Sequence, residues 1–356
     1  MVDAPPNTVL IVTDAWHPQV NGVVRTLSRL ALELEAVGHR AVFVTPQQFR
    51  TVPLPSYPEI RLALRPRRRL ARLIQAAQPC AIHIATEGPL GWAARRYCLR
   101  RRLPFTTAYH TRFPEYVHAR FRVPLPVSYR LLRRFHAPSS AVMVATRSVE
   151  GDLAARGFAR MRRWSRGVDT ALFHPRSEAE VAAIAPHLAG LSRPLFLYVG
   201  RVAVEKNIGA FLALDLPGCK VVVGDGPQLP ELRRRHPEVL FAGAHQGESL
   251  AAHYAAADVF VFPSRTDTFG LVLLEALASG VPVAAFPVAG PRDVLGDSGA
   301  GVLSEDLGAA ALEALDIEAA TCLEHARTFS WEASCRQFLS NLDPFDGGIW
   351  TTPESA

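Results

Sequence analysis

The chain is 356 residues long and 49% hydrophobic, which is enough apolar sequence for two packed domains and excludes a disordered protein. Its net charge of +6 is unevenly spread, because residues 1–180 carry +16 and the remainder carries −10. No run of about 18 apolar residues is present, so the sequence predicts no transmembrane anchor. The five widely spaced cysteines include no CxxC pair, so we expect mostly buried, reduced thiols and no zinc or redox centre.

The first predicted elements are a strand over residues 8–14 and a helix over 21–37. The strand is apolar as far as Asp14 and no basic segment precedes it, so the N-terminus does not resemble a signal peptide. We therefore expect the protein in the cytoplasm. Asn21 and Gly22 come where the helix begins, and a glycine there lets the backbone approach a phosphate closely. Asn-Gly is equally an ordinary turn signal.

Strands and helices alternate through the rest of the first half, with strand-like runs RAVFVTP, AIHIAT, FTTAYHT and AVMVAT. This alternation is typical of βαβ units and a parallel sheet. Glu87 follows the run AIHIAT, where it could meet a ligand hydroxyl group, although an acid is equally favoured at the start of the next helix. His110 lies at the carboxyl end of FTTAYHT, where ligands bind in open α/β sheets, and its imidazole can donate to a ligand oxygen.

The positive charge of the first half comes from 28 arginines and no lysine. They cluster at residues 65–72, 95–102, 130–134 and 156–166. Solvated helix faces would explain any single cluster, whereas four clusters in one half predict an electropositive surface for an anionic partner. We expect anionic lipid headgroups rather than nucleic acid, because no helix-turn-helix, RNA-recognition or zinc-finger pattern accompanies the arginines.

The alternation restarts in the second half, with strand-like runs PLFLYVG, CKVVVGDG, VLFAGA, VFVFPS and PVAAFPV. We therefore expect an α/β fold of two doubly wound parallel sheets, with the linker and the first helix of the second domain within residues 169–192 and the boundary near residue 172. Ligands bind beyond the carboxyl ends of the strands in such sheets, so a cleft between the two domains is the expected site.

Two cations, Arg201 and Lys206, flank a short loop after the strand in LYVGRVAVEKNI. Fixed positive charges there can stabilise a leaving group that becomes more negative in the transition state. A surface arginine and a helix-start lysine paired with Glu205 is the alternative interpretation.

A second informative segment is PSRTDTFGLVLLEALASGVPVAAFPVAG, residues 263–290. A strand ends at Ser264, Asp267 follows in a loop, and a helix starts near Gly270. The unpaired N–H groups in the first turn of that helix suit hydroxyl and phosphate oxygens. Glu275 comes eight residues after Asp267, close enough for both carboxylates to hold one elongated ligand. The alternative is that Asp267 caps the helix and Glu275 is an ordinary helix-start acid.

The order and spacing of these segments resemble glycosyltransferase family 4. The family's diagnostic pair of glutamates, separated by seven residues and followed by an ALASGxPV stretch, corresponds to Asp267 and Glu275 before ALASGVPV. The other matching segments are TDAWHPQVNGVVRTL, YHTRFPEYVHAR, RGVDTALFHP, LYVGRVAVEKNI and SWEASCRQFLSNL. Asp267 departs from the usual glutamate by one methylene, which leaves the donor sugar open.

The resemblance implies a GT-B fold of two Rossmann-like domains facing across a cleft. Residues 1–172 would form the acceptor domain and 173–329 the nucleotide-sugar donor domain, with a helix over 330–345 returning to the first domain and a tail over 346–356. The implied catalytic residues are His110, Arg201, Lys206 and Asp267. The implied donor-binding residues are Gly22, Arg201, Lys206, Asp267, Phe269, Gly270, Leu271 and Glu275, and the acceptor candidates are Asn21 and Glu87.

The family's chemistry implies particular roles for these residues. Arg201 and Lys206 would stabilise the departing diphosphate, Asp267 would hold sugar hydroxyls together with the backbone of 269–271, and Glu275 would bind the donor ribose. The anomeric configuration would be retained through a same-face mechanism in which the leaving phosphate deprotonates the acceptor. We expect no metal ion or other cofactor, because no DxD motif and no ligand-spaced His/Cys/carboxylate cluster occurs.

The expected function is transfer of a hexose from UDP-glucose, another UDP-hexose or GDP-mannose to a lipid such as diacylglycerol. The arginine-rich half would dock on the anionic cytoplasmic face of the cell membrane. In pattern the chain most resembles bacterial lipid glycosyltransferases, namely diacylglycerol glucosyl- and sulfoquinovosyltransferases and phosphatidylinositol mannosyltransferases. A mannosyltransferase acting on a soluble or polyprenyl-linked glycan is the alternative. A nucleic-acid-binding protein, a sugar-nucleotide epimerase and a phosphorylase remain further alternatives from other classes.

Overall fold

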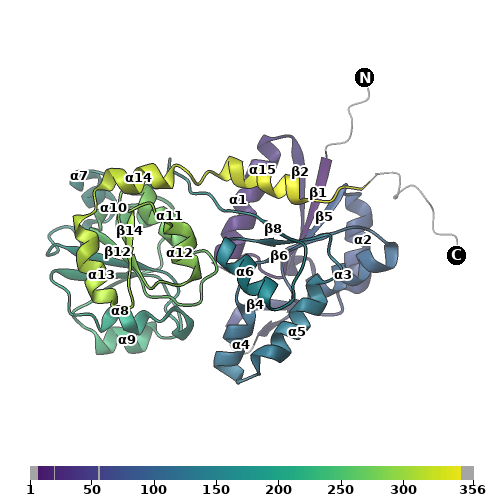
Figure 1. The fold of residues 1–356 in the computed structure, drawn as a ribbon, viewed down its shortest axis with the longest axis horizontal. Coiled ribbons are helices and arrows are strands. Elements are labelled where there is room, and N and C mark those ends of the chain that lie inside the picture. Colours follow the sequence, from purple (N-terminus) through teal and green to yellow (C-terminus); the bar gives the residue numbers. More distant parts are fainter. Residues whose placement is uncertain (1–6, 20, 55–56, 346–356) are drawn as a thin grey trace. The chain divides into compact units, whose positions relative to one another are not determined.

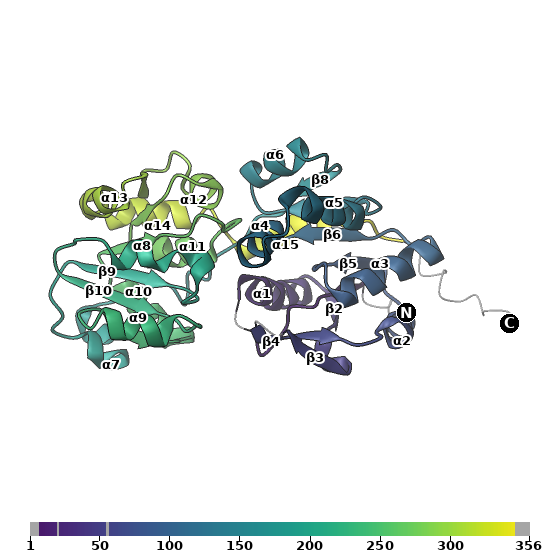
Figure 2. The same ribbon diagram turned by 90° about the horizontal axis from the view of Figure 1, so that it is seen from below.

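The computed structural model describes residues 7–19, 21–54 and 57–345, and the predicted tail over 346–356 lies outside this part of the chain. The chain divides into two compact units (Figures 1 and 2). The first consists of Met1–Ser165 with Trp331–Ala356, and the second of Arg166–Ser330. Residue 172, the boundary expected from the sequence, therefore lies within the second unit.

The first unit is built on a six-stranded parallel sheet in the order β2-β1-β5-β6-β7-β8. Its strands are β1 (Asn7–Val12), β2 (His39–Val44), β5 (Ala81–Ile84), β6 (Thr106–Tyr109), β7 (Ala141–Val144) and β8 (Met161–Arg163). Its helices are α1 (Gly22–Ala36), η1 (Pro46–Gln48), α2 (Arg67–Ala77), α3 (Pro89–Arg101), α4 (Phe113–Phe121), α5 (Leu125–His136), α6 (Arg147–Ala155) and α15 (Trp331–Asn341). An antiparallel hairpin of β3 (Thr51–Leu54) and β4 (Tyr57–Ala63), which the sequence pattern did not reveal, is inserted after η1.

Both faces of this sheet are covered, which explains why β1 is apolar at successive positions. Leu10 and Val12 belong to the core on one face, and Val9 and Ile11 to the core on the other, as the two-residue period of a strand requires. The C-terminal helix α15 contributes Phe338 to the second of these cores. The indole Nε1 of Trp164 also donates a 3.1 Å hydrogen bond to Ser334 Oγ in α15.

The second unit repeats the architecture with the order β11-β10-β9-β12-β13-β14, again all parallel. Its strands are β9 (Leu195–Val199), β10 (Cys219–Val223), β11 (Leu240–Gly243), β12 (Val259–Phe262), β13 (Val283–Ala285) and β14 (Gly301–Leu303). Its helices are α7 (Glu178–Ile184), η2 (Pro186–Leu188), η3 (Val204–Lys206), α8 (Ile208–Leu212), α9 (Leu229–Arg235), α10 (Gly247–Ala256), α11 (Leu271–Ala278), α12 (Ala289–Leu295), α13 (Leu307–Glu313), η4 (Ala314–Asp316) and α14 (Ala319–Ala326). The expected α/β class with two doubly wound parallel sheets is confirmed.

Two further expectations concern the membrane and the cysteines. Within the described residues, no helix combines the length and the apolar character that a bilayer-spanning segment needs. All five cysteines are free thiols, and Cys98, Cys322 and Cys335 are buried.

Candidate active site

Each sheet has one point where the strand order reverses, and there the crevice beyond the strand ends is open to a ligand. In the second unit this point lies between β9 and β12, the two middle strands. Arg201 and Lys206 follow β9, and Asp267 follows β12. The fold therefore brings the predicted cations and the first predicted carboxylate to the same edge of one sheet.

Two glycines fix the backbone of the loop that carries Arg201. A Cβ atom at Gly224 would clash with the carbonyl oxygen of Gly200, and one at Gly226 would clash with the carbonyl oxygen of Val202. The amide of Val202 also donates a 2.9 Å hydrogen bond to the carbonyl of Asp225. The loop after β10 thus lies directly against both sides of Arg201, a function of the run VVVGDG that sequence reasoning missed.

Lys206 and Asp267 form an ion pair across this switch point. Lys206 Nζ lies 2.5 Å from Asp267 Oδ1, and both side chains are largely buried. The alternative that Asp267 caps the next helix is wrong, because Gly270 is the N-cap of α11 and no side chain in the described part of the chain caps that helix. Asp267 comes three residues before Gly270, the N-cap of α11, whose first N–H groups lack intrahelical partners.

Asp267 has a second carboxylate oxygen that the fold leaves unused. Asp267 Oδ2 is buried and makes no hydrogen bond within the described part of the chain. The buried Oγ of Ser264, at the end of the same strand, is likewise without a hydrogen bond among the described residues. Buried polar atoms are normally paired, so both atoms are suited to a ligand hydroxyl group.

The loop between Asp267 and α11 is held by close backbone approaches. Gly270 has φ of +90°, a left-handed conformation that favours glycine. A Cβ atom at Gly290, in the first turn of α12, would lie 2.9 Å from the carbonyl oxygen of Asp267 and 3.0 Å from that of Phe269. The backbone of residues 269–271 is therefore positioned by α12 as well as by α11.

Glu275 is fixed by a partner from another helix. Its side chain is 3% exposed, and Oε2 accepts a 2.9 Å hydrogen bond from the hydroxyl of Tyr254 in α10. If Glu275 binds the donor ribose as predicted, its carboxylate contacts both Tyr254 and the ribose. Tyr254 lies 21 residues before Glu275 in the chain, so no local pattern could have identified it.

In the first unit, the corresponding switch point lies between β1 and β5 and carries Asp14, which sequence reasoning did not select. Asp14 is 7% exposed and accepts hydrogen bonds from the amides of Leu90 and Gly91, in the first turn of α3, and from the hydroxyl of Thr86. Burial raises the pKa of this carboxyl group to about 6, although these hydrogen bonds oppose the shift. Asp14 thus caps α3 from a distant strand, and only its place at a strand end could have pointed to it.

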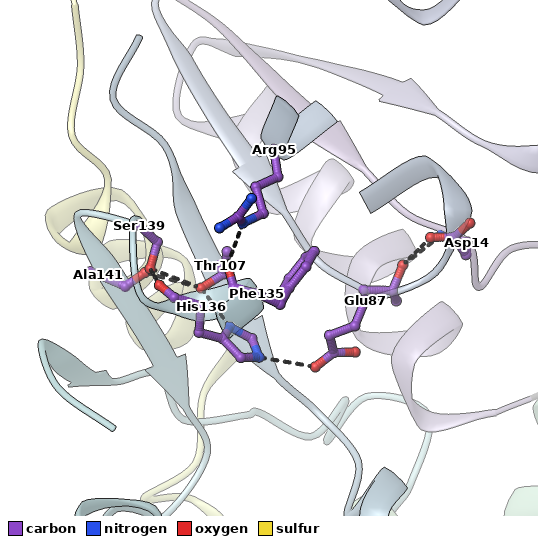
Figure 3. Close-up of polar contacts among 9 residues, drawn as sticks. Asp14, Glu87, Arg95, Thr107, Phe135, His136, Ser139 and Ala141 are labelled. Atoms are coloured by element: carbon purple, nitrogen blue, oxygen red, sulfur yellow. Dashed lines mark hydrogen bonds and ion pairs between the residues drawn. The ribbon is translucent and has the colours of Figure 1, made fainter. Parts of the chain in front are cut away.

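Glu87, an acceptor candidate, meets a histidine rather than capping α3. Its Oε1 lies 3.2 Å from Nε2 of the buried His136, and Figure 3 shows the carboxylate pointing at the ring. The other ring nitrogen, Nδ1, lies 2.9 Å from Thr107 Oγ1, which donates in turn to Ser139 Oγ. A chain of polar groups therefore runs from the end of β5 into the interior, and His136 was not predicted to take part.

The other predicted residues of the first unit lie at element ends. Half-buried His110 follows β6, and its ring packs edge-on against Trp164 with centroids 5.6 Å apart. Asn21 is the N-cap of α1, where Oδ1 accepts from the amides of Val23 and Val24, and Gly22 is the first residue of that helix. The catalytic role of His110 and the ligand contacts of Asn21 and Gly22 stay predictions.

Comparison with known proteins gives this site a context. Residues 20–172 match the family model described as Glycosyltransferase Family 4, and residues 193–317 match the model described as Glycosyl transferases group 1. The chain is 31% identical over 323 residues to a GDP-mannose-dependent alpha-mannosyltransferase of Mycobacterium tuberculosis, covering 83% of each chain. It is 29% identical over 345 residues to an alpha-monoglucosyldiacylglycerol synthase of Streptococcus pneumoniae, covering 86% of this chain and 77% of that protein.

A solved structure shares the fold. The sucrose-phosphate synthase of Thermosynechococcus elongatus superposes with a TM-score of 0.74 over 94% of this chain and 98% of that chain, at 22% identity. The likeness extends over both units, and at this identity it bears on the fold alone.

Proposed function

Since the chain belongs to the nucleotide-sugar glycosyltransferases that join a family 4 domain to a group 1 domain in a GT-B fold, we propose that it is a retaining, metal-independent hexosyltransferase with a lipid acceptor. The donor is GDP-mannose or a UDP-hexose such as UDP-glucose, and the acceptor is a lipid such as diacylglycerol at the cytoplasmic face of the membrane. The observation that carries the proposal is the Lys206–Asp267 pair at the β9–β12 switch point, with one carboxylate oxygen unused.

The donor diphosphate takes the cationic side of this site. Lys206, held by Asp267, and Arg201 face the negative charge that grows on the leaving diphosphate as the glycosidic bond breaks. The uncapped N-terminus of α11 adds backbone N–H groups and the positive end of a helix dipole. Lys206 is held by Asp267 before the reaction, which supports a stabilisation that costs little reorganisation in the transition state.

The donor sugar and nucleoside take the carboxylate side. Asp267 Oδ2 accepts a hydrogen bond from a sugar hydroxyl, and Ser264 Oγ donates one or accepts one. Glu275, aligned by Tyr254, binds the ribose. An alpha-linked product from GDP-mannose, as the name of the relative in M. tuberculosis describes, requires retention, because the sugar of GDP-mannose is itself alpha-linked. His110 is the proposed supporting residue on the acceptor side.

A lipid acceptor agrees with the surface of α4 and α5. Val127, Arg130, Leu131 and Arg134 recur at helical spacing on α5 and are all exposed, whereas Tyr129, Leu132 and Phe135 of the same helix are buried. Phe113 and Phe121, at the two ends of the adjacent α4, are 54% and 62% exposed. Figures 1 and 2 show the two helices side by side.

Exposed apolar side chains between arginines are the pattern of a helix that lies in a membrane interface rich in anionic lipid. The relative in S. pneumoniae is, by its name, a synthase of a glucosyldiacylglycerol. We therefore propose the outer face of α4 and α5 as the part that docks on the membrane.

The first test is donor turnover by the purified full chain with anionic vesicles that contain diacylglycerol. GDP-mannose, UDP-glucose, UDP-galactose and UDP-glucuronate are compared, each with and without EDTA. Glycolipid formed in EDTA, with retained configuration of the new bond, is the expected result. Turnover that requires added Mg²⁺ would refute metal independence, and turnover only on soluble glycans would refute the lipid acceptor.

A second experiment tests the docking face. The double variant Val127→Ser/Leu131→Ser should bind anionic vesicles about thirtyfold more weakly than the wild type, because about 2 kcal/mol of apolar burial is lost. Its turnover of a detergent-dispersed acceptor should be unchanged. Leu312→Ser, on an exposed apolar position of α13 in the other unit, is the control. Vesicle binding that both changes weaken equally would rule out a dedicated face.

The alternative acceptor is a soluble or polyprenyl-linked glycan, with GDP-mannose as the donor. The 31% identity to a GDP-mannose-dependent alpha-mannosyltransferase is the observation that favours it. Mannose transfer to a soluble glycan that continues in the absence of vesicles would support this alternative.

A further inference from the structure

Three histidines of the second unit meet outside the donor site. His187 lies in η2, His245 follows β11, and His253 lies in α10. One ring nitrogen from each lies within 4.8 Å of the others, and the His245 and His253 ring centroids are 4.4 Å apart. They come from segments up to 66 residues apart in the chain, so a search for ligand spacing in the sequence could not find them.

The hydrogen bond of His253 Nδ1 to the backbone leaves the lone pair of Nε2 for a metal ion. Its Nδ1 lies 2.6 Å from the carbonyl oxygen of Ser249, and a carbonyl can only accept, so Nδ1 carries the proton. The lone pair is then on Nε2, the nitrogen that faces His187. An imidazole whose far nitrogen donates to a backbone carbonyl is the usual form of a metal-ligating histidine.

The spacing of the nitrogens also fits an ion. Nε2 of His253 lies 3.0 Å from Nε2 of His187. Two imidazole nitrogens that each bind a metal ion at about 2.0–2.1 Å are held about 2.8–3.4 Å apart for angles between a right angle and a tetrahedral one. The same distance also suits a hydrogen bond between two neutral rings, in which His187 donates to His253, and the experiment below separates the two arrangements.

His245 can become the third ligand if one of its ring nitrogens gives up its present hydrogen bond. Its Nε2 lies 3.2 Å from the carbonyl oxygen of Ala242, and its Nδ1 lies 2.8 Å from Ser249 Oγ. A bound ion replaces one of these two hydrogen bonds. If it replaces the longer one, the Ser249 hydroxyl becomes the acceptor that orients the ring, as outer partners do in metal sites.

We propose that His187, His245 and His253 form a binding site for a divalent transition-metal ion of the Zn²⁺ type. Three neutral imidazoles suit Zn²⁺, Ni²⁺ and Cu²⁺, whereas Mg²⁺ and Ca²⁺ prefer oxygen ligands. His187 is exposed, so water can supply a fourth ligand and the ion can enter from solvent.

The site has a structural role rather than a part in sugar transfer. The ion ties η2, near the start of the second unit, to α10, which also carries the Tyr254 that aligns Glu275. It therefore stabilises the position of α10. The proposal does not depend on the donor or acceptor, and metal-independent catalysis at Lys206 and Asp267 is compatible with it.

The experiment uses the full chain without a histidine tag, stripped with EDTA and dialysed. Equilibrium dialysis with Zn²⁺ measures stoichiometry, Co²⁺ provides a visible absorption spectrum as the probe of nitrogen ligation, and thermal melting measures stabilisation. We expect one Zn²⁺ per chain and a higher Tm with Zn²⁺. The His187→Gln and His253→Gln variants should bind Zn²⁺ at least tenfold more weakly and lose the rise in Tm.

The matched control is His236→Gln, which changes a histidine of the same unit that faces Glu238 instead of the cluster. It should bind Zn²⁺ as the wild type does. Because His187 is exposed, His187→Gln should melt at the wild-type temperature in EDTA, which separates lost binding from lost folding. Zn²⁺ binding by His187→Gln that equals the wild type, or no stoichiometric binding by the wild type, would show that the histidines only hydrogen-bond to one another.

Discussion

The two units place a strand-end aspartate at the same kind of switch point, but they use it differently. Asp14 in the first unit has both carboxylate oxygens occupied by its own chain, through Thr86 and the first turn of α3. Asp267 in the second unit uses one oxygen for Lys206 and leaves the other buried without a hydrogen bond among the described residues. A strand-end acid is thus a candidate ligand site only where the fold leaves part of its hydrogen-bonding capacity unused.

The comparison predicts that removing Lys206 from the Lys206–Asp267 pair strongly slows transfer while leaving the fold intact. Lys206→Ala should lower kcat about 10²–10³-fold, or about 3–4 kcal/mol, because a preorganised charge at the leaving diphosphate is lost. Steady-state kinetics with saturating donor measures this loss. Arg235→Ala, which removes an exposed cation of α9 in the same unit, should leave kcat unchanged. A loss below threefold in Lys206→Ala would contradict the assignment of the leaving group to this loop.

Asp14, in contrast, should affect stability and its pH dependence. Its folded pKa of about 6 lies above the ordinary value of 3.8, so the folded state binds the proton more tightly than the unfolded state. The stabilisation is present in full below about pH 4 and is lost as the pH rises through 6. Over this range the wild type should lose roughly 3 kcal/mol of unfolding free energy relative to Asp14→Asn.

Urea unfolding at a series of pH values measures this difference. Glu35→Gln, which changes an exposed acid of α1, should show no comparable change relative to the wild type. If the free-energy difference between the wild type and Asp14→Asn is constant from pH 4 to 6.5, Asp14 is not the buried titrating group described above.

A smaller effect on activity is expected from changing Tyr254, which hydrogen-bonds to Glu275 from a different helix. Tyr254→Phe removes the hydrogen bond to Glu275 and leaves a buried carboxylate oxygen less well paired, which costs about 1.5 kcal/mol. If Glu275 binds the ribose, the KM for the donor should rise about tenfold while kcat changes less. Tyr97→Phe, in the first unit, is the matched control. An unchanged KM for the donor in Tyr254→Phe would show that Glu275 does not bind the donor.

The sequence predicted which charged residues meet at the β9–β12 switch point, because their places at strand ends are local features. Arg201, Lys206 and Asp267 were found because each follows an apolar run, and parallel strands end at one edge of their sheet. The β3–β4 hairpin was missed because its residues alternate weakly and include prolines, which are poor strand signals. The capping alternative for Asp267 could not be decided from sequence, since Lys206 lies 61 residues away.

The sequence by itself determined the alternating elements, the two parallel sheets and the charged residues at the strand ends, because periodicity and strand-end position are local properties. Tertiary structure alone decided which polar groups are satisfied. It joined Tyr254 to Glu275 and Asp14 to α3, and it brought three histidines from separate segments together. The physical reason is that hydrogen bonds and ligand geometry depend on distances within about 3 Å, which only the packing of helices against the sheets can set.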